Sequence, residues 1–242
     1  ETTDKTLFMD EFVDDSVTMT MDDIEKILIH HSRDNGNVPH TPESTMMTLA
    51  GILQKEYAMR RIYSPEAANA HRLGNIHIHN ADMPSRLYCG GHSPSYVAKY
   101  GLSLPNLNSA AKPAKYADVF LEQLIKFAAS MQGHFSGAVG FDAVNMFIAP
   151  YLVGLSDEKV KQCAQILVYE FAQQAVARGG QVIFSDLNLY WEIPKHYQNV
   201  EAIGPGGVSL GVPYKEFDYE SKRFMKALMQ VYAEGDGAGR PF

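Results

Sequence analysis

The sequence predicts an α/β fold with strands inside and helices outside. Predicted helices are followed twice by a predicted strand, first over residues 76–80 and again over residues 181–193. This alternation is typical of α/β architecture. The composition is that of a globular domain, because 45% of the 242 residues are hydrophobic and 20% are charged. The chain stops soon after its last predicted helix, so we expect an unfinished sheet.

The bulk properties exclude several classes of protein. A net charge of −7 leaves no basic surface for a nucleic-acid backbone. No apolar run reaches the roughly 18 residues of a membrane span, and the N-terminus lacks a signal-peptide pattern. Cys89 and Cys163 are the only cysteines, which gives no disulfide framework and fits a reducing compartment. We therefore expect a cytoplasmic protein that binds neither nucleic acid nor membrane.

The first third of the chain is predicted to be helical. Helices are expected over residues 21–33, from 42 to about 61 and from 65 to about 73. Thr41 and Ser64 each precede a proline and a glutamate. That order supplies a helix cap, a residue suited to the first helical position and a favourable first-turn charge.

A short strand with one polar face is predicted next. His77 and His79 alternate with isoleucines, which is a period-2 pattern. Ten residues after His79 comes Cys89, followed by Gly90 and Gly91. Glycines allow a ligand to approach the backbone closely. This stretch suggests the wall of an active site, whereas a buried core cysteine is the plainer interpretation.

The remaining elements follow from periodicity and end signals. We expect a loop at 93–115, a helix at 116–131, a helix from 156 to about 178, a strand at 181–193, a loop at 196–217 and a last helix at about 219–233. Cys163 lies on the apolar face of its helix and is expected in the core. Asp186 and Asn188 share one face of their strand, which either faces a ligand or is solvated.

Motifs for common chemistries are missing or incomplete. The sequence has no phosphate-binding loop, no dinucleotide fingerprint and no CxxC pair. His77 and His79 could hold one metal ion, as in barrel hydrolases, but later strands add little beyond Asp186. Cys89 could be a nucleophile with His92 as its base, although no orienting Asn or Asp is evident.

Several long segments, in the same order, resemble the anaerobic (class III) ribonucleoside-triphosphate reductases, of archaeal type. They include AHRLGNIHIHNAD, RLYCGGH, GGQVIFSDLNLYWEI and EGDGAGRPF. The resemblance is dense from Ser64 to Phe242 and thinner before it. It implies that residues 64–242 form the first half of a ten-stranded α/β barrel with dimer-interface helices, and that residues 1–63 form a helical N-terminal region.

The resemblance also implies a reaction. Such enzymes reduce ribonucleoside triphosphates to 2′-deoxyribonucleoside triphosphates by radical chemistry under anaerobic conditions. An S-adenosylmethionine-dependent iron–sulfur activase makes a glycyl radical, which passes to a cysteine on a loop through the barrel. The resulting thiyl abstracts the 3′-hydrogen, and a second cysteine on the first barrel strand donates hydrogen as the 2′-hydroxyl leaves.

The RLYC motif gives this second role to Cys89. A thiol held on a packed strand suits the donation of a hydrogen atom. Gln123 is expected on the dimer-interface helix where deoxynucleotide effectors bind, and Asn80 replaces the aspartate of the family's HIHD motif. The resemblance places five residues at the substrate: His79, Gly90, Gly179, Gly180 and Gln181.

Several parts of the family pattern have no counterpart in the sequence. The loop cysteine, the C-terminal zinc cysteines and the glycyl-radical motif are all expected beyond Phe242, and the N-terminal ATP-binding cone is missing. No metal or other cofactor is expected within the chain. We expect an incomplete portion that does not turn over alone. Its expected partners are ribonucleoside triphosphates, deoxynucleotide or ATP effectors, the activase and a second copy in a homodimer.

Two other functions stay open at this point. A non-catalytic nucleotide- or partner-binding module derived from the family would be a closed fold with Cys89 buried away from any cleft. A metal-dependent hydrolase would hold its ion at His77 and His79.

Overall fold

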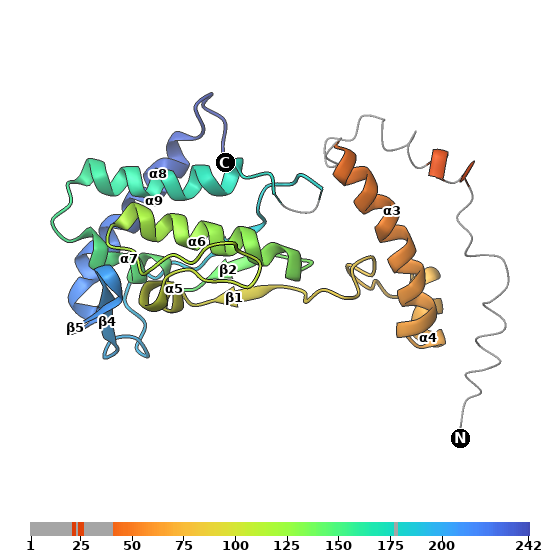
Figure 1. Cartoon of the computed structure of the whole chain (residues 1–242), viewed down its shortest axis with the longest axis horizontal. Coiled ribbons are helices and arrows are strands. Elements are labelled where there is room, and N and C mark those ends of the chain that lie inside the picture. The colour runs from red at the N-terminus through yellow and green to blue at the C-terminus, as the bar shows by residue number, and fades with distance from the viewer. Residues whose placement is uncertain (1–20, 23, 27–40, 177–178) are drawn as a thin grey trace, which may run out of the picture. The chain divides into compact units, whose positions relative to one another are not determined.

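The computed structural model describes residues 21–22, 24–26, 41–176 and 179–242 (Figure 1). The chain divides into two compact units. The first, here called the helical unit, comprises Glu1–Arg86 and Arg178–Gly180. The second, here called the sheet unit, comprises Leu87–Ala177 and Gln181–Phe242.

Two capped helices build the helical unit. Helix α3 (Pro42–Tyr57) continues into a π-helical turn (Ala58–Ile62), and α4 (Pro65–Arg72) follows. The predicted caps are confirmed, because Thr41 Oγ1 accepts a hydrogen bond from a backbone N–H three residues on (3.0 Å) and the Ser64 hydroxyl does the same (3.3 Å). Of the predicted helix at 21–33, residues 21–22 and 24–26 are helical and the rest lies outside the described residues.

The predicted strand at residues 76–80 is wrong. The backbone N–H groups of Asn75 and Ile76 donate to the carbonyl of Ala70, and that of Ile78 donates to His71 Nδ1. These bonds extend the end of α4 into a series of turns. A strand also needs a ladder partner, and none lies beside this segment among the described residues. The alternation of apolar and polar residues is thus no sign of a strand here, since Ile78 packs against a small buried cluster while Ile76 is 46% exposed.

A three-stranded parallel sheet is the centre of the sheet unit. Its strands β1 (Gly90–His92), β2 (Val139–Phe141) and β3 (Ser185–Leu187) lie in the order β1-β2-β3. Between β1 and β2 the chain forms α5 (Ser95–Tyr100) and α6 (Ala117–Met131). Between β2 and β3 it forms α7 (Val144–Leu152) and α8 (Asp157–Gln173).

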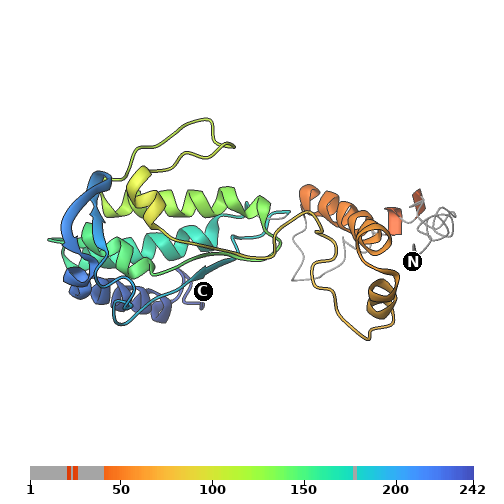
Figure 2. The same cartoon turned by 90° about the horizontal axis from the view of Figure 1, so that it is seen from below.

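The chain after β3 adds a hairpin and a long helix. Strands β4 (Glu201–Gly204) and β5 (Val208–Pro213) pair antiparallel, and α9 (Asp218–Glu234) follows. Short 3₁₀ turns at Pro205–Gly207 and Tyr214–Phe217 flank β5. Figure 2 shows the segment between α5 and α6 as a long loop that projects from the unit.

The helices pack on one side of the three strands. Figure 1 shows α6 and α8 on the same side of the sheet. On β1 the ring of His92 lies 4.9 Å from that of Phe127 on α6, and on β2 Phe141 lies 5.8 Å from the same ring. One hydrophobic cluster joins β2 and β3 to α6, α7, α8 and α9. The opposite side of the sheet carries no such cover within the unit.

Most helix predictions hold, and the strand predictions hold less well. Helices α6, α8 and α9 are confirmed, although α8 ends at Gln173 rather than near residue 178. The predicted loop at 93–115 is wrong in its first part, which forms α5, and the predicted loop at 196–217 is wrong because it contains the β4–β5 hairpin. The predicted strand at 181–193 pairs only over β3, because the buried Asn145 side chain on α7 binds both the N–H and the C=O of Tyr190 (3.1 and 2.8 Å).

Among the helices that the structure describes, none combines the length and the hydropathy needed to cross a bilayer.

Candidate active site

The two faces of the parallel sheet differ sharply. Side chains alternate along a strand, so the partners His92, Phe141 and Leu187 share one face, which packs on the helices and is here called the covered face. One residue earlier, Gly91, Gly140 and Asp186 are also paired across the strands and share the other face, here called the open face.

Cys89 lies on the open face, immediately before β1, and its side chain is exposed. It is two residues from Gly91, so strand alternation gives it the same side. Beneath it lies Gly137, where a β-carbon would overlap with Cys89 Sγ and would approach Tyr88 O to 2.7 Å. The glycine therefore makes room for the thiol against the strand.

Asp186, on the other edge strand β3, also lies against a glycine. A β-carbon on Gly140 would lie 3.4 Å from Asp186 Cβ and 3.8 Å from its Oδ2. Cys89, just before β1, and Asp186 on β3 thus both lie against glycines in or just before β2. We call the surface formed by Gly91, Gly137 and Gly140 the floor. Among the described residues, and apart from its chain neighbours, no atom lies within 4 Å of the position that a β-carbon on Gly91 would take, so the floor is open above Gly91.

His92 lies behind the floor, on the covered face. Its ring contacts those of Phe127, Phe135 and Phe141 at 4.9, 5.7 and 6.4 Å. Burial lowers the pKa of His92 below its ordinary value of 6.5, and its Nε2 is buried without a hydrogen-bond partner. Because Cys89 projects from the opposite face, the alternative in which His92 activates the thiol as a base has no geometric support.

A polar cluster closes the carboxyl end of the strands. Asp142, directly after β2, accepts hydrogen bonds from the hydroxyls of Tyr190 (2.8 Å) and Tyr197 (3.3 Å). The hydrogen bond to the carboxylate raises the pKa of Tyr190, while burial and the same carboxylate raise the pKa of Tyr197. Neither tyrosine was singled out in the sequence. Their hydroxyls stay protonated and fix the turn between β2 and α7.

His79, expected at the substrate, lies exposed in the turns after α4 of the helical unit. Its ring is 5.6 Å from that of His77, which is 5.8 Å from that of His71. No group of three metal-ligating side chains converges anywhere in the described part of the chain. The histidine pair thus gives no support to the metallohydrolase interpretation.

Gly179 and Gly180 also belong to the helical unit. Both have positive φ angles, of 78° and 97°, which glycine adopts without strain. The carbonyl of Gly179 accepts a hydrogen bond from Thr41 Oγ1 (2.7 Å), and a β-carbon there would lie 2.6 Å from Ser44 Cα. These glycines therefore hold the start of α3, which is a structural reason for their presence beside any role in binding.

Three further predicted residues lie in the sheet unit. Gly90 faces the covered side, where a β-carbon would overlap with Phe135 and come within 2.8 Å of His92 Nε2. Gln181 is exposed before β3. Gln123 is buried in α6, where its Nε2 donates to the carbonyl of Lys112 (2.8 Å) and its Oε1 has no partner.

The two cysteines differ in their exposure to solvent. Cys163 is buried in α8, as predicted from its position on the apolar face of the helix. Burial raises its pKa to about 11, with a smaller contribution from Asp118. Its thiol is therefore protonated and shielded, while that of Cys89 is open to solvent.

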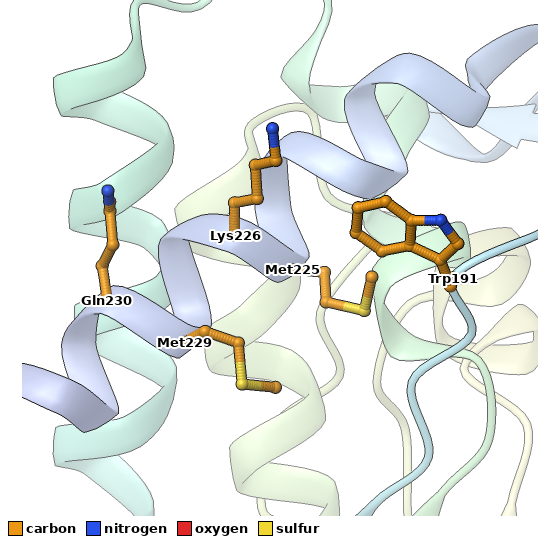
Figure 3. A pocket seen from close by; sticks show the side chains of 5 residues that line it. All are labelled: Trp191, Met225, Lys226, Met229 and Gln230. Atoms are coloured by element: carbon orange, nitrogen blue, oxygen red, sulfur yellow. The ribbon is translucent and has the colours of Figure 1, made fainter.

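Two hollows lie beside the helices of the sheet unit. One, of about 400 Å³, lies between Trp191 and the methionines of α9, with Lys226 and Gln230 at its rim (Figure 3). The other, of about 330 Å³, follows the outer edge of β3 between α8 and α9, and Asp186 is among the residues that line it. Thioethers, an indole and aliphatic groups line most of the first hollow. Lys226 is the only ionisable group among its described lining residues, with no second acid or base beside it, so it is not the candidate active site.

Two of the three glycines of the floor were missed in the sequence, and Gly91 was noted there only beside Cys89. Gly137 and Gly140 stand in a mixed stretch of glycines and aromatics that gave no clear period. A glycine inside a strand often marks a place where another group comes close to the backbone. That signal, read together with the short strand Val139–Phe141, would have identified them.

Comparison with known proteins bears on this geometry. The model of the anaerobic ribonucleoside-triphosphate reductase family matches residues 34–242. No curated protein sequence gives a significant match. Among solved structures, the anaerobic ribonucleotide reductase from Thermotoga maritima with glycerol in the active site has a TM-score of 0.65 at 16% identity, and 94% of this chain matches 37% of that chain.

The same Thermotoga maritima enzyme in complex with dATP and CTP gives a TM-score of 0.58 at 17% identity. There 76% of this chain matches 32% of that chain. This chain thus spans about a third of the length of the solved reductases it matches. At such identities the structural likeness shows the mixed α/β fold, while the match over residues 34–242 shows descent. The chain belongs to the anaerobic ribonucleoside-triphosphate reductase family.

Proposed function

We propose that this chain forms the first half of the ten-stranded barrel of an anaerobic ribonucleoside-triphosphate reductase, with Cys89 as the hydrogen donor to the substrate. The observation that carries the proposal is the exposed Cys89 thiol on a glycine floor. Residues 64–242 would be the half-barrel and residues 1–63 a helical N-terminal region. The segments quoted from the sequence favour the archaeal type.

The sheet supports the proposal, with three of the five strands that half of a ten-stranded barrel would contain. Its three strands are parallel and in order, and helices cover one face only. In the described part of the chain, no strand pairs with the outer edge of β1 or of β3. Either edge can therefore be extended by further strands, and the open face would become the inside of the barrel.

Cys89 fits the role of a hydrogen-atom donor. The thiol is accessible, and Gly137 allows it to lie close to the strand instead of projecting freely. A donor held in place loses less conformational freedom when the substrate binds. A glycyl radical, which members of this family use, would start the chemistry from outside this chain.

The other expected contacts follow from the family resemblance. We propose that His79, Gly90, Gly179, Gly180 and Gln181 contribute to the substrate site of the assembled enzyme. Gln123 would support effector binding indirectly, because it is buried and fixes the backbone at Lys112. We further propose a cytoplasmic homodimer, activated by a radical S-adenosylmethionine enzyme, with ribonucleoside triphosphates as substrates and a zinc site in the C-terminal part.

The test is a pair of cysteine variants in a complete, activated reductase that includes this chain. Cys89→Ser should abolish deoxynucleotide formation, because an O–H bond is too strong to give its hydrogen atom in place of S–H, while nucleotide binding persists. Cys163→Ser is the matched control and should keep its turnover once allowance is made for any loss of stability. Turnover by Cys89→Ser close to that of the unchanged enzyme would contradict the proposal.

A second candidate is a non-catalytic nucleotide-binding module derived from the family. It would be favoured by a closed fold with Cys89 buried. The exposure of Cys89 and the uncovered sheet face favour the reductase instead. Nucleotide binding that persists together with an unchanged rate for Cys89→Ser would revive this second candidate.

A further inference from the structure

We propose that Asp186 is a substrate-orienting residue whose carboxylate accepts a hydrogen bond from a hydroxyl of the ribose. This inference rests on the proposed function, since it concerns the same open face. It concerns a residue for which the family resemblance supplied no role. Asp186 lies in register with Gly140 and Gly91, on the same face as Cys89.

Asp186 lies across the open face from Cys89. Cys89 and Asp186 stand on strands two places apart, which are separated by about 10 Å in a sheet. Both side chains lie against glycines of the central strand segment, Cys89 against Gly137 and Asp186 against Gly140. The two functional groups therefore stand on opposite sides of one floor that has no side chains of its own. A sugar ring lying on this floor would have a thiol on one side and a carboxylate on the other.

Asp186 is preceded on its strand by exposed apolar side chains. Val182 and Phe184 precede it on the same face and are 47% and 58% exposed. A face with apolar side chains and bare glycines is not built for bulk water. The Asp186 carboxylate has no hydrogen bond or ion pair with any residue that the structure describes. It is thus an unused acceptor beside the apolar side chains of Val182 and Phe184, as expected of a group that orients a ligand.

The negative charge of Asp186 determines which part of a bound nucleotide can lie beside it. A carboxylate repels a triphosphate but accepts hydrogen bonds from hydroxyl groups. The ribose hydroxyls should therefore point toward Asp186 and the phosphates away from it. The direction in which nucleotide affinity changes when Asp186 is removed therefore distinguishes hydrogen bonding from simple charge repulsion. If Asp186 acted only through its charge, removing it would strengthen the binding of any triphosphate.

The chain itself provides the readout, because Cys89 is exposed and Cys163 is buried. Alkylation of Cys89 by iodoacetamide is followed by peptide mass spectrometry, which reads each thiol separately. A nucleotide seated on the floor should shield Cys89, and the concentration that gives half protection measures its affinity. The probes are CTP and ATP, each paired with its 2′,3′-dideoxy analogue, which lacks both hydroxyls.

We expect Asp186→Ala to weaken protection by CTP or ATP roughly tenfold to a hundredfold, the range for losing a hydrogen bond to a charged group. Asp186→Asn should weaken it less, because the amide keeps an acceptor without the charge. Protection by the dideoxy analogues should be unchanged or stronger in both variants. Glu158→Gln, an exposed acid on α8, should change neither. An unchanged alkylation rate of Cys89 without nucleotide shows that each variant is folded around the thiol.

The outcomes separate the two proposals. If the ribonucleotides protect the unchanged chain and both Asp186 variants equally, the role of Asp186 is refuted and the reductase proposal stands. Equal weakening with ribonucleotides and dideoxy analogues would also refute hydroxyl recognition. Failure of any nucleotide to protect Cys89 in the unchanged chain would count against substrate binding on the open face, and so against both.

Discussion

The two faces of the parallel sheet are made of the same three strands but of different residues. On the covered face, His92, Phe141 and Leu187 fill the space beneath the helices. On the open face, the residues paired at the neighbouring position are Gly91, Gly140 and Asp186.

A sheet that only had to fold would gain from larger side chains on its second face, because glycine in a strand is less stable than alanine by about 0.5–1 kcal/mol. Small residues are retained where something must come close to the backbone. The contrast therefore supports the proposal that the covered face serves stability and the open face binds a ligand. Matched substitutions on the two faces should reveal this division.

The largest contrast should come from two phenylalanines. Phe141 is 2% exposed on the covered face, while Phe184 is 58% exposed on the open face. Phe141→Ala should lower the free energy of unfolding by about 3–5 kcal/mol, because it removes buried surface and leaves a cavity. Phe184→Ala should lower it by less than about 1 kcal/mol. Urea unfolding of the two variants makes the comparison, and similar losses would mean that the open face is covered in solution.

The two cysteines offer the next contrast. Burial raises the pKa of Cys163 to about 11, so at pH 8 only about one thiol in a thousand is ionised there, and the thiolate is the reactive form. Cys89 is exposed. Iodoacetamide should therefore modify Cys89 at least about a hundredfold faster than Cys163. Comparable rates in the folded chain would place the Cys89 thiol in a buried environment and remove the basis of its proposed role.

A pair of glycine substitutions probes the floor itself. Gly137→Ala should lower the free energy of unfolding by about 1–3 kcal/mol, because the new methyl group overlaps with Cys89 Sγ. Gly91→Ala places its methyl in open space and should leave stability unchanged or raise it slightly. Thermal unfolding followed by circular dichroism distinguishes them. If Gly91→Ala were as damaging as Gly137→Ala, the floor would be packed against something.

The smallest effect concerns His92 on the covered face. Burial lowers its pKa below 6.5 in the folded chain, so just below pH 6.5 the unfolded chain binds more protons than the folded chain. The stability that His92 contributes is therefore complete above pH 6.5 and is lost as the pH falls through the folded value. The urea midpoint should fall between about pH 7.5 and about pH 5.5 by more in the unchanged chain than in His92→Leu. An equal fall would assign the acid sensitivity to other groups.

Much of the helical structure could be predicted because its signals are local. Thr41, Ser64 and Ser156 are caps whose side chains accept the expected backbone hydrogen bonds. The amphipathic pattern of α6 and the termination of α9 at Gly235 are equally local. Each of these features needs only residues within a few positions of one another.

The strands could be predicted less well because pairing joins distant parts of the chain. The pattern at residues 76–80 has the right period but no partner strand, and Val139–Phe141 has only three residues in which to show a period. The long alternation after Gln181 is cut short by Asn145, some forty residues earlier. In the candidate site, Cys89 was found through its motif. Gly137 and Gly140 of the floor were missed, because they meet Cys89 and Asp186 only after the sheet has formed.

The central claim is that the open face receives the ribose of a nucleotide beside Cys89, and Gly91→Ala tests it most directly. The added methyl lies on the floor without touching any described atom, so it should block a ligand and leave the fold intact. We expect the concentration of CTP or ATP that half-protects Cys89 from alkylation to rise at least about tenfold, with an unchanged unfolding temperature. Full protection at the original concentration, in a variant of unchanged stability, would contradict the account.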